Sequence, residues 1–143
     1  MRKLLFTVFF AVGLYSCTTY TVAPNSFREQ FLAAGSTMEE VQVNNPIFPA
    51  TNITYRANTI KKIKVVDKNG NVEYIENSPS IEMRVTQKNG KKRVVYFDTV
   101  ELRNNTLYGS GSRLIGGPVR KIPFDSIAKI EIQDGGKNYH YQK

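Results

Sequence analysis

The chain has one cysteine, one histidine and no tryptophan among its 143 residues. A single cysteine cannot form an intramolecular disulfide, and a zinc site needs several Cys or His ligands at suitable spacing. The one histidine, His140, lies near the end of the chain and would be the only conventional base for a serine nucleophile. We therefore expect no metal site, no cofactor and no catalytic activity.

The acidic residues do not form the pattern of a hydrolase either. A paired-carboxylate hydrolase needs two acids held close together in space. The central acids instead alternate with other side chains along segments that read as strands, which is typical of a solvated sheet face. These acids are Glu73, Glu76, Glu82, Asp98 and Glu101.

Long hydrophobic runs are also lacking, apart from the eleven residues from Leu4 to Leu14. This run follows a basic start, Met1-Arg2-Lys3, and is too short to span a bilayer as a helix. A basic start followed by a short apolar run is typical of a secretory signal peptide. The sequence predicts a signal peptide over residues 1–16 and export of the remainder.

The single cysteine directly follows this segment, in Leu14-Tyr15-Ser16-Cys17. These residues resemble the lipobox of bacterial lipoproteins, with an aliphatic residue three positions before the cysteine and a small residue just before it. The resemblance implies a diacylglycerol thioether on Cys17, cleavage after Ser16 and acylation of the new amino terminus. Tyr15 departs from the small residue common at its position. The alternative is an ordinary secreted protein whose cysteine lies there by chance.

The two residues after Cys17 bear on where such a lipoprotein would reside. Thr18 and Thr19 are uncharged, so neither an aspartate retention signal nor an acidic surface-export cluster is present. By this resemblance we expect an outer-membrane lipoprotein that faces the periplasm, with the inner membrane and the cell surface as alternatives.

The positive charge is concentrated in the second half of the chain. The formal net charge is +8, and from Lys61 onward there are 16 Lys and Arg against 9 Asp and Glu. A basic domain can face anionic headgroups or acidic polymers, but lysines on strands also keep a sheet soluble. Basic and aromatic residues interleave at 91–97, yet an exported chain is separated from nucleic acid, so we expect no nucleic-acid partner.

The first part of the exported chain has little regular pattern. We expect residues 17–25 to form a lipidated tether and residues 26–58 to form a short helix and an irregular connection. Ser26 and Glu29 have capping-box spacing, and Gly35 stands where a helix would end. Residues 36–43 fit either a further turn or a strand.

Residues 59–143 read as an antiparallel β domain. Two hairpins are expected around "DKNG" and "QKNGK", with positive φ at both central turn residues, and a third is expected around Arg103–Thr106. Apolar and polar residues alternate at 81–86 and 129–133, which is typical of a sheet with one buried face. "YHYQ" at 139–142 fits either an exposed tail or a closing strand. The predicted fold is mainly β: a small antiparallel meander forming a barrel or sandwich, with one short N-terminal helix.

A glycine-rich segment offers the one local signal for ligand binding. Glycine backbones can cradle phosphate and arginines add charge, but the spacing matches no Walker or dinucleotide-binding pattern, so the alternative is a mobile loop. The candidate binding residues are Gly109, Gly111, Arg113, Gly116, Gly117 and Arg120.

The sequence thus predicts a non-catalytic, lipid-anchored envelope protein that acts as an accessory or interaction subunit. Its partners would be the membrane, through acyl chains on Cys17, and another envelope protein. The alternative is a β domain that binds a small ligand or an anionic polymer through its basic face and the glycine-rich loop.

Overall fold

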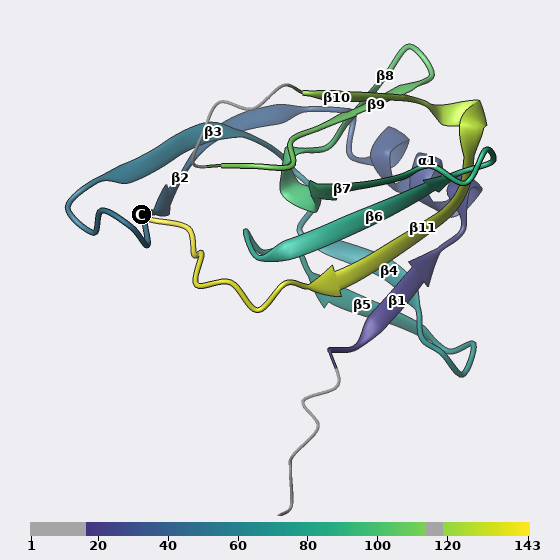
Figure 1. Cartoon of the computed structure of the whole chain (residues 1–143), viewed down its shortest axis with the longest axis horizontal. Coiled ribbons are helices and arrows are strands. Elements are labelled where there is room, and N and C mark those ends of the chain that lie inside the picture. Colours follow the sequence, from purple (N-terminus) through teal and green to yellow (C-terminus); the bar gives the residue numbers. More distant parts are fainter. Residues whose placement is uncertain (1–16, 114–118) are drawn as a thin grey trace, which may run out of the picture.

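A computed structural model describes residues 17–113 and 119–143 of the chain. The described residues form one helix and eleven strands in antiparallel sheets, so the mainly β prediction is confirmed (Figure 1). The elements are β1 (Thr19–Val22), α1 (Pro24–Ala33), β2 (Met38–Asn44), β3 (Asn52–Asn58), β4 (Lys62–Val66), β5 (Val72–Glu76), β6 (Ile81–Gln87), β7 (Lys92–Tyr96), β8 (Glu101–Arg103), β9 (Thr106–Gly109), β10 (Arg120–Pro123) and β11 (Ile127–Asp134), with 3₁₀ turns η1 (Phe97–Thr99) and η2 (Phe124–Ser126).

Three sheets make up the fold. The largest has six strands in the order β5-β4-β1-β11-β6-β7, while β10-β9-β8 and β2-β3 form two smaller sheets. The described strands do not close the large sheet on itself, since β5 and β7 stand at its two edges. Of the two forms expected from the sequence, this open arrangement fits a sandwich.

The core lies between the large sheet, α1 and the sheet formed by β8, β9 and β10. The expected alternation is confirmed, because Ile81, Met83 and Val85 on β6 and Ile130 and Ile132 on β11 are buried. The residues that alternate with them along each strand point to the opposite face of the sheet. Burial of one face of each strand fixes the register of this sheet.

Helix α1 covers the core with two phenylalanines. The ring of Phe27 lies 4.5 Å from that of Phe31, 6.3 Å from that of Phe97 and 6.2 Å from that of Phe124. The helix begins at Pro24, whose missing N–H costs nothing in a first turn. The expected start at Ser26 is therefore wrong by one half-turn, whereas Gly35 follows the helix with a φ of +73°, as its predicted role requires.

Residues 17–25 do not form the expected tether. Thr19–Val22 form β1, which pairs with β11 over four register positions and with β4 at Thr21, and Val22 is buried. The tether prediction for residues 17–25 is wrong here because β-branched and aromatic side chains favour a strand once a partner strand is present. Among the described residues, Cys17 and Thr18 precede this strand.

The segment expected as an irregular connection also contributes strands. Met38–Asn44 resolves the ambiguity at 36–43 in favour of a strand, and it pairs with β3 along its full length. The irregular part is confined to the turn at 45–51. Figure 1 shows this long hairpin standing away from the large sheet, with the C-terminal segment beside it.

The three predicted hairpins are present, but their turns differ from expectation. Around "DKNG" and "QKNGK" only the glycines have positive φ, +85° at both Gly70 and Gly90. The prediction of two positive φ values is therefore wrong for both hairpins for which it was made. The third hairpin, for which no turn geometry was predicted, has two such residues, Asn104 and Asn105, with φ of 49° and 54°. Asparagine tolerates this conformation better than most residues because its side chain is short and polar.

The C-terminal segment follows the edge of β2. Tyr141 forms a single β-bridge to Val43, and the amide of Gln142 donates to the carbonyl of Gln42 at 2.8 Å. The segment is therefore neither a free tail nor a full closing strand.

Candidate functional site: the surroundings of Cys17 and the Arg113–Asp98 centre

Cys17 lies at one end of the large sheet, two residues before β1. Its side chain is exposed, and its Sγ lies 2.9 Å from the carbonyl oxygen of Asp134, the last residue of β11. Beside it is a mainly apolar hollow of about 720 Å³, whose lining includes Tyr20, Ile75 and Ile81. The candidate lipidation residue thus lies beside the folded domain, at the end of the large sheet.

The candidate loop residues do not form a single site. Gly109 ends β9 and pairs with Arg120 of β10, and a Cβ on Gly109 would lie 3.1 Å from Val95 on β7. A Cβ on Gly111 would lie 3.0 Å from the guanidinium of Arg120 and 3.2 Å from the carbonyl of Val94. Both glycines allow the chain to approach β7 closely. Gly116 and Gly117 lie outside the described residues.

Arg113 is buried and paired. One guanidinium nitrogen lies 2.6 Å from Asp98 Oδ1, and the two side chains are 1% and 0% exposed. The same nitrogen donates to the carbonyl of Pro79 at 2.5 Å. Arg113 therefore does not project into solvent as a ligand-binding arginine would.

Tyrosines surround this ion pair. The guanidinium of Arg113 lies 4.0 Å from the ring centroid of Tyr96, 4.6 Å from that of Tyr55 and 5.5 Å from that of Tyr139. The hydroxyls of Tyr55 and Tyr141 both donate to Asp98 Oδ2, that of Tyr141 at 2.9 Å. The centre gathers β3, the end of β7 and the C-terminal segment around one carboxylate.

The surroundings of Asp98 shift the pKa of two tyrosine hydroxyls. Burial, followed by the negative charge of Asp98, raises the pKa of the Tyr55 and Tyr141 hydroxyls. Arg113 opposes this shift at both hydroxyls. The tyrosines thus stay protonated and act as donors that satisfy Asp98.

Sequence reasoning missed this centre. It placed Asp98 on a solvated face, and that prediction is wrong because Asp98 is in η1, directly after β7, and is fully buried. The only local signal was its position after the apolar run Val94–Phe97. Nothing in the spacing pointed to Arg113, Tyr55 or Tyr141 as its partners.

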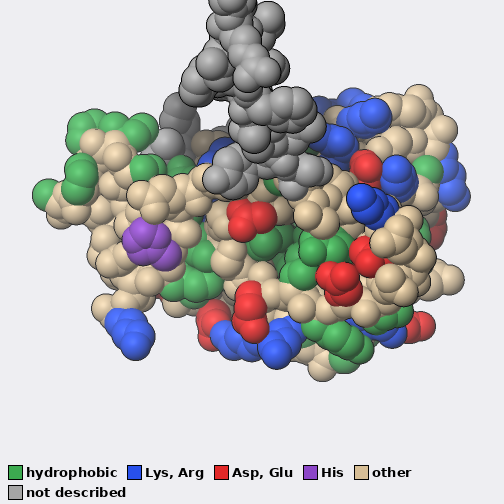
Figure 2. All heavy atoms as spheres, turned by 90° about the horizontal axis from the view of Figure 1, so that it is seen from below, with side chains coloured by type: hydrophobic (Ala, Val, Ile, Leu, Met, Phe, Trp, Pro, Cys, Tyr) green, Lys and Arg blue, Asp and Glu red, His purple; other side chains and the backbone are tan. Residues whose placement is uncertain are grey.

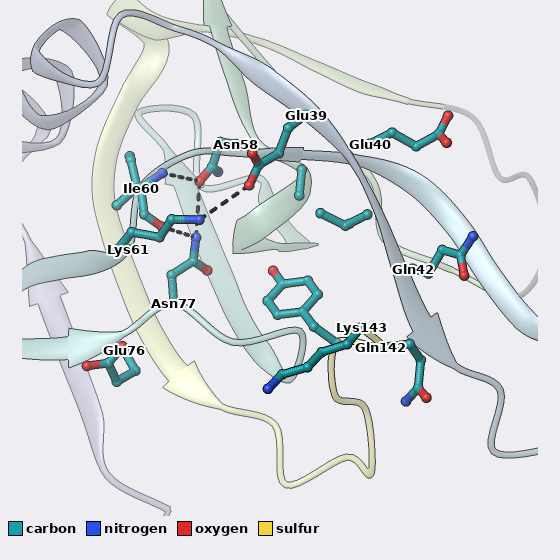
Figure 3. A pocket seen from close by; sticks show the side chains of 13 residues that line it. Glu39, Glu40, Gln42, Asn58, Ile60, Lys61, Glu76, Asn77, Gln142 and Lys143 are labelled. Atoms are coloured by element: carbon teal, nitrogen blue, oxygen red, sulfur yellow. Dashed lines mark hydrogen bonds and ion pairs between the residues drawn. The ribbon is translucent and has the colours of Figure 1, made fainter.

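A polar cleft of about 670 Å³ lies between the β2–β3 hairpin, the start of β4 and the C-terminal segment (Figure 3). On its rim Lys61 Nζ lies 3.3 Å from Glu39 Oε1. Deeper in the cleft, the side-chain amide of Asn77 donates to Asn58 Oδ1 at 3.1 Å and to the carbonyl of Ile60 at 2.8 Å. Glu40 and Glu76 also line the cleft, so its charge is not that of an anion site.

Some basic residues of the large sheet and of the segment after it are paired with acids, whereas Lys64, Lys92 and Arg93 of the same sheet have no acidic partner among the described residues. Figure 2 shows Lys and Arg side chains next to Asp and Glu side chains on the face seen from below. Lys137 lies 2.7 Å from Glu82, Lys129 lies 3.2 Å from Glu131, and Lys62 lies 3.8 Å from Glu76. This pairing reduces the field available to an anionic partner.

Within residues 17–113 and 119–143, no three His, Cys, Asp or Glu side chains gather as a metal site would require. The single helix of this part of the chain is too short and polar to cross a membrane. Comparison with family models, with curated proteins and with solved structures finds no match.

Proposed function

We propose that this chain is a non-catalytic, lipid-anchored envelope protein, held at the outer membrane and facing the periplasm. The observation that supports it most directly is the position of Cys17, which is exposed and separated from β1 by one residue. A modification at Cys17 needs no rearrangement of the fold. The apolar start and the lipobox-like LYSC then supply the signal.

The short spacing gives the anchor a mechanical consequence. Each buried methylene contributes about 0.8 kcal/mol to membrane binding, and two or more acyl chains hold a protein stably. Since β1 pairs with β11 and β4, the acyl chains would attach almost directly to the centre of the large sheet. The domain would sit against the membrane surface and search for its partner in two dimensions, which raises the effective concentration of a neighbouring envelope protein.

The experiment that tests the anchor is metabolic labelling with a clickable fatty acid in a bacterial host. The native chain should incorporate label and fractionate with the outer membrane. Cys17→Ala should lose the label completely, while Thr18→Ala, one residue along, should keep it. Label that persists in Cys17→Ala, or a native chain without label, would show that the anchor is not there.

The alternative function is binding of a small ligand. Its original basis is weakened at the glycine-rich loop, because Arg113 is buried in an ion pair with Asp98. The polar cleft of Figure 3 favours it instead, with amide and carboxylate groups suited to a neutral or cationic polar molecule. Native mass spectrometry of the chain purified from membranes would detect such a ligand, and its displacement by Asn77→Leu would assign it to this cleft.

A further inference from the structure

Within the described part of the chain, strand β5 presents an unpaired edge of the large sheet. The amide of Asn77 donates to the carbonyl of Lys61, and that of Asp67 donates to the carbonyl of Asn71, both at 2.9 Å. Bonded pairs alternate along an antiparallel ladder, so Ile75 and Glu73 use their backbone groups toward β4. The N–H and C=O groups of Val72, Tyr74 and Glu76 therefore point away from the sheet.

The side chains on this edge are those of an interface rather than of a protected edge. Val72 is 53% exposed and Tyr74 is 63% exposed, among the largest exposures of apolar side chains in the described part of the chain. Sheet proteins usually guard a free edge with charged side chains, above all lysine, or with proline or a bulge. The strand Val-Glu-Tyr-Ile-Glu has no lysine, proline or bulge, and its two glutamates are its only charged residues.

We propose that β5 pairs with β5 of a second copy of this chain, antiparallel and centred on Tyr74. In this register Tyr74 lies opposite Tyr74 of the other copy, and Val72 lies opposite Glu76. The outward N–H and C=O groups of Val72, Tyr74 and Glu76 then all meet hydrogen-bonding partners on the other copy. This follows because bonded pairs recur at every second residue of an antiparallel ladder. The large sheet would continue from one copy into the other.

The charges of the strand fit this register. Each Glu76 faces an apolar valine across the interface and keeps its own partner, Lys62, at 3.8 Å on β4. Each Glu73 faces Ile75, so no like charges stand directly opposite one another. The central tyrosine pair adds the kind of aromatic cross-strand contact that stabilises antiparallel sheets.

The two-fold symmetry of this dimer is compatible with a lipid anchor on each copy. The pairing itself does not depend on the anchor. A two-fold axis that relates antiparallel strands in one sheet is perpendicular to that sheet. Both copies of Cys17 then lie at the same height along the axis and on symmetric sides of it. Both can therefore enter the same membrane.

Cysteine crosslinking tests the register. The Cα atoms of a bonded antiparallel pair lie about 5.5 Å apart, within the range that a disulfide spans. Under mild oxidation of membranes, Tyr74→Cys should give at least about tenfold more disulfide-linked dimer than Val94→Cys, the matched outward position on β7. The native chain, which contains only Cys17, reports any crosslinking through that residue. Equal crosslinking of the two variants would overturn the proposal.

A backbone substitution tests the pairing itself. Tyr74→Pro removes an outward N–H and no bond to β4, a change that edge strands tolerate. The two copies would then lose two symmetric hydrogen bonds, so the association constant of the dimer should fall about tenfold or more. Sedimentation of the detergent-solubilised chain measures this constant, and the melting temperature should stay unchanged. Tyr74→Ala keeps the N–H and should associate more strongly than Tyr74→Pro. A native chain that stays monomeric at about 0.1 mM, in the range of weak complexes, would exclude a second copy and leave a different strand as the occupant.

Discussion

The two edges of the six-stranded sheet are treated in opposite ways. At β7 the outward amide of Tyr96 donates to the carbonyl of Ser110 at 2.8 Å, and Gly111 passes close to the carbonyl of Val94. At β5 no described residue takes up the outward groups. Within the described residues, a loop of the chain thus covers part of the β7 edge, while no other strand pairs with the β5 edge.

The cover on β7 depends on the Arg113–Asp98 centre. Asp98 follows β7 and Arg113 follows the Ser110–Ser112 loop, so their ion pair closes this loop over the edge. The amide of Ser110 also donates to Thr99 Oγ1 at 2.9 Å. On the β5 side the corresponding support is slight, since β4 and β1 share one register position, Thr21 with Val66.

The largest loss of stability is expected from removing the ion pair that holds the Ser110–Ser112 loop over β7. Asp98→Ala leaves the guanidinium of Arg113 buried without its counter-charge, which typically costs about 3–5 kcal/mol in stability. Urea unfolding followed by circular dichroism measures this loss. Asp125→Ala is the control, because that carboxylate is exposed and should contribute less than about 1 kcal/mol. A loss at Asp98 as small as that at Asp125 would show that the ion pair does not hold the loop.

A smaller effect is expected on the β5 side, where Gln30 of α1 stands in for a neighbouring strand. Its amide accepts from the Lys64 N–H at 2.8 Å and donates to the Lys64 carbonyl at 3.1 Å. Gln30→Ala leaves both backbone groups without these partners, at about 1–3 kcal/mol. Hydrogen exchange should show faster exchange at Lys64 than in the native chain, with β6 and β11 unchanged. Glu29→Ala, the exposed neighbour, should leave Lys64 protected, and equal exchange in both variants would contradict the role of Gln30.

The difference between the edges explains what the sequence could and could not predict. Strands β6 and β11 carry period-two alternation over five or more residues, so their buried faces were predictable from local pattern alone. Strand β1 has only four residues, and its partner β11 lies more than 100 residues away. Its strand conformation comes from that pairing, which no local window contains.

The β7 cover was hidden from the sequence for a related reason. Asp98 and Arg113 are 15 residues apart, on either side of the hairpin of β8 and β9. A carboxylate after an apolar run and an arginine among glycines each have an ordinary local interpretation as solvated groups. Only the tertiary fold brings them together and makes one the counter-charge of the other. The glycines pointed to the right segment for the wrong reason, since close approach to β7 requires them rather than a phosphate.

The smallest change in stability is expected at high pH, from the tyrosines beside the β7 edge. Burial and Asp98 raise the pKa of Tyr55 and Tyr141 above the value in the unfolded chain, which is about 10. The folded state then binds protons that the unfolded state releases. The stability from these tyrosines is fully present below about pH 10 and is lost as the pH rises further.

Unfolding free energies measured from neutral to alkaline pH should therefore fall above about pH 10. Tyr55→Phe should make this fall shallower, because one of the raised groups no longer titrates. The same titration of tyrosinate absorbance in urea supplies the unfolded reference. A native chain whose stability is flat across this range, or a Tyr55→Phe variant with the native slope, would mean that the hydroxyl of Tyr55 does not hold its proton for Asp98. The loop over β7 would then be held by the Arg113–Asp98 ion pair and the hydrogen bonds of Ser110, without a contribution from Tyr55.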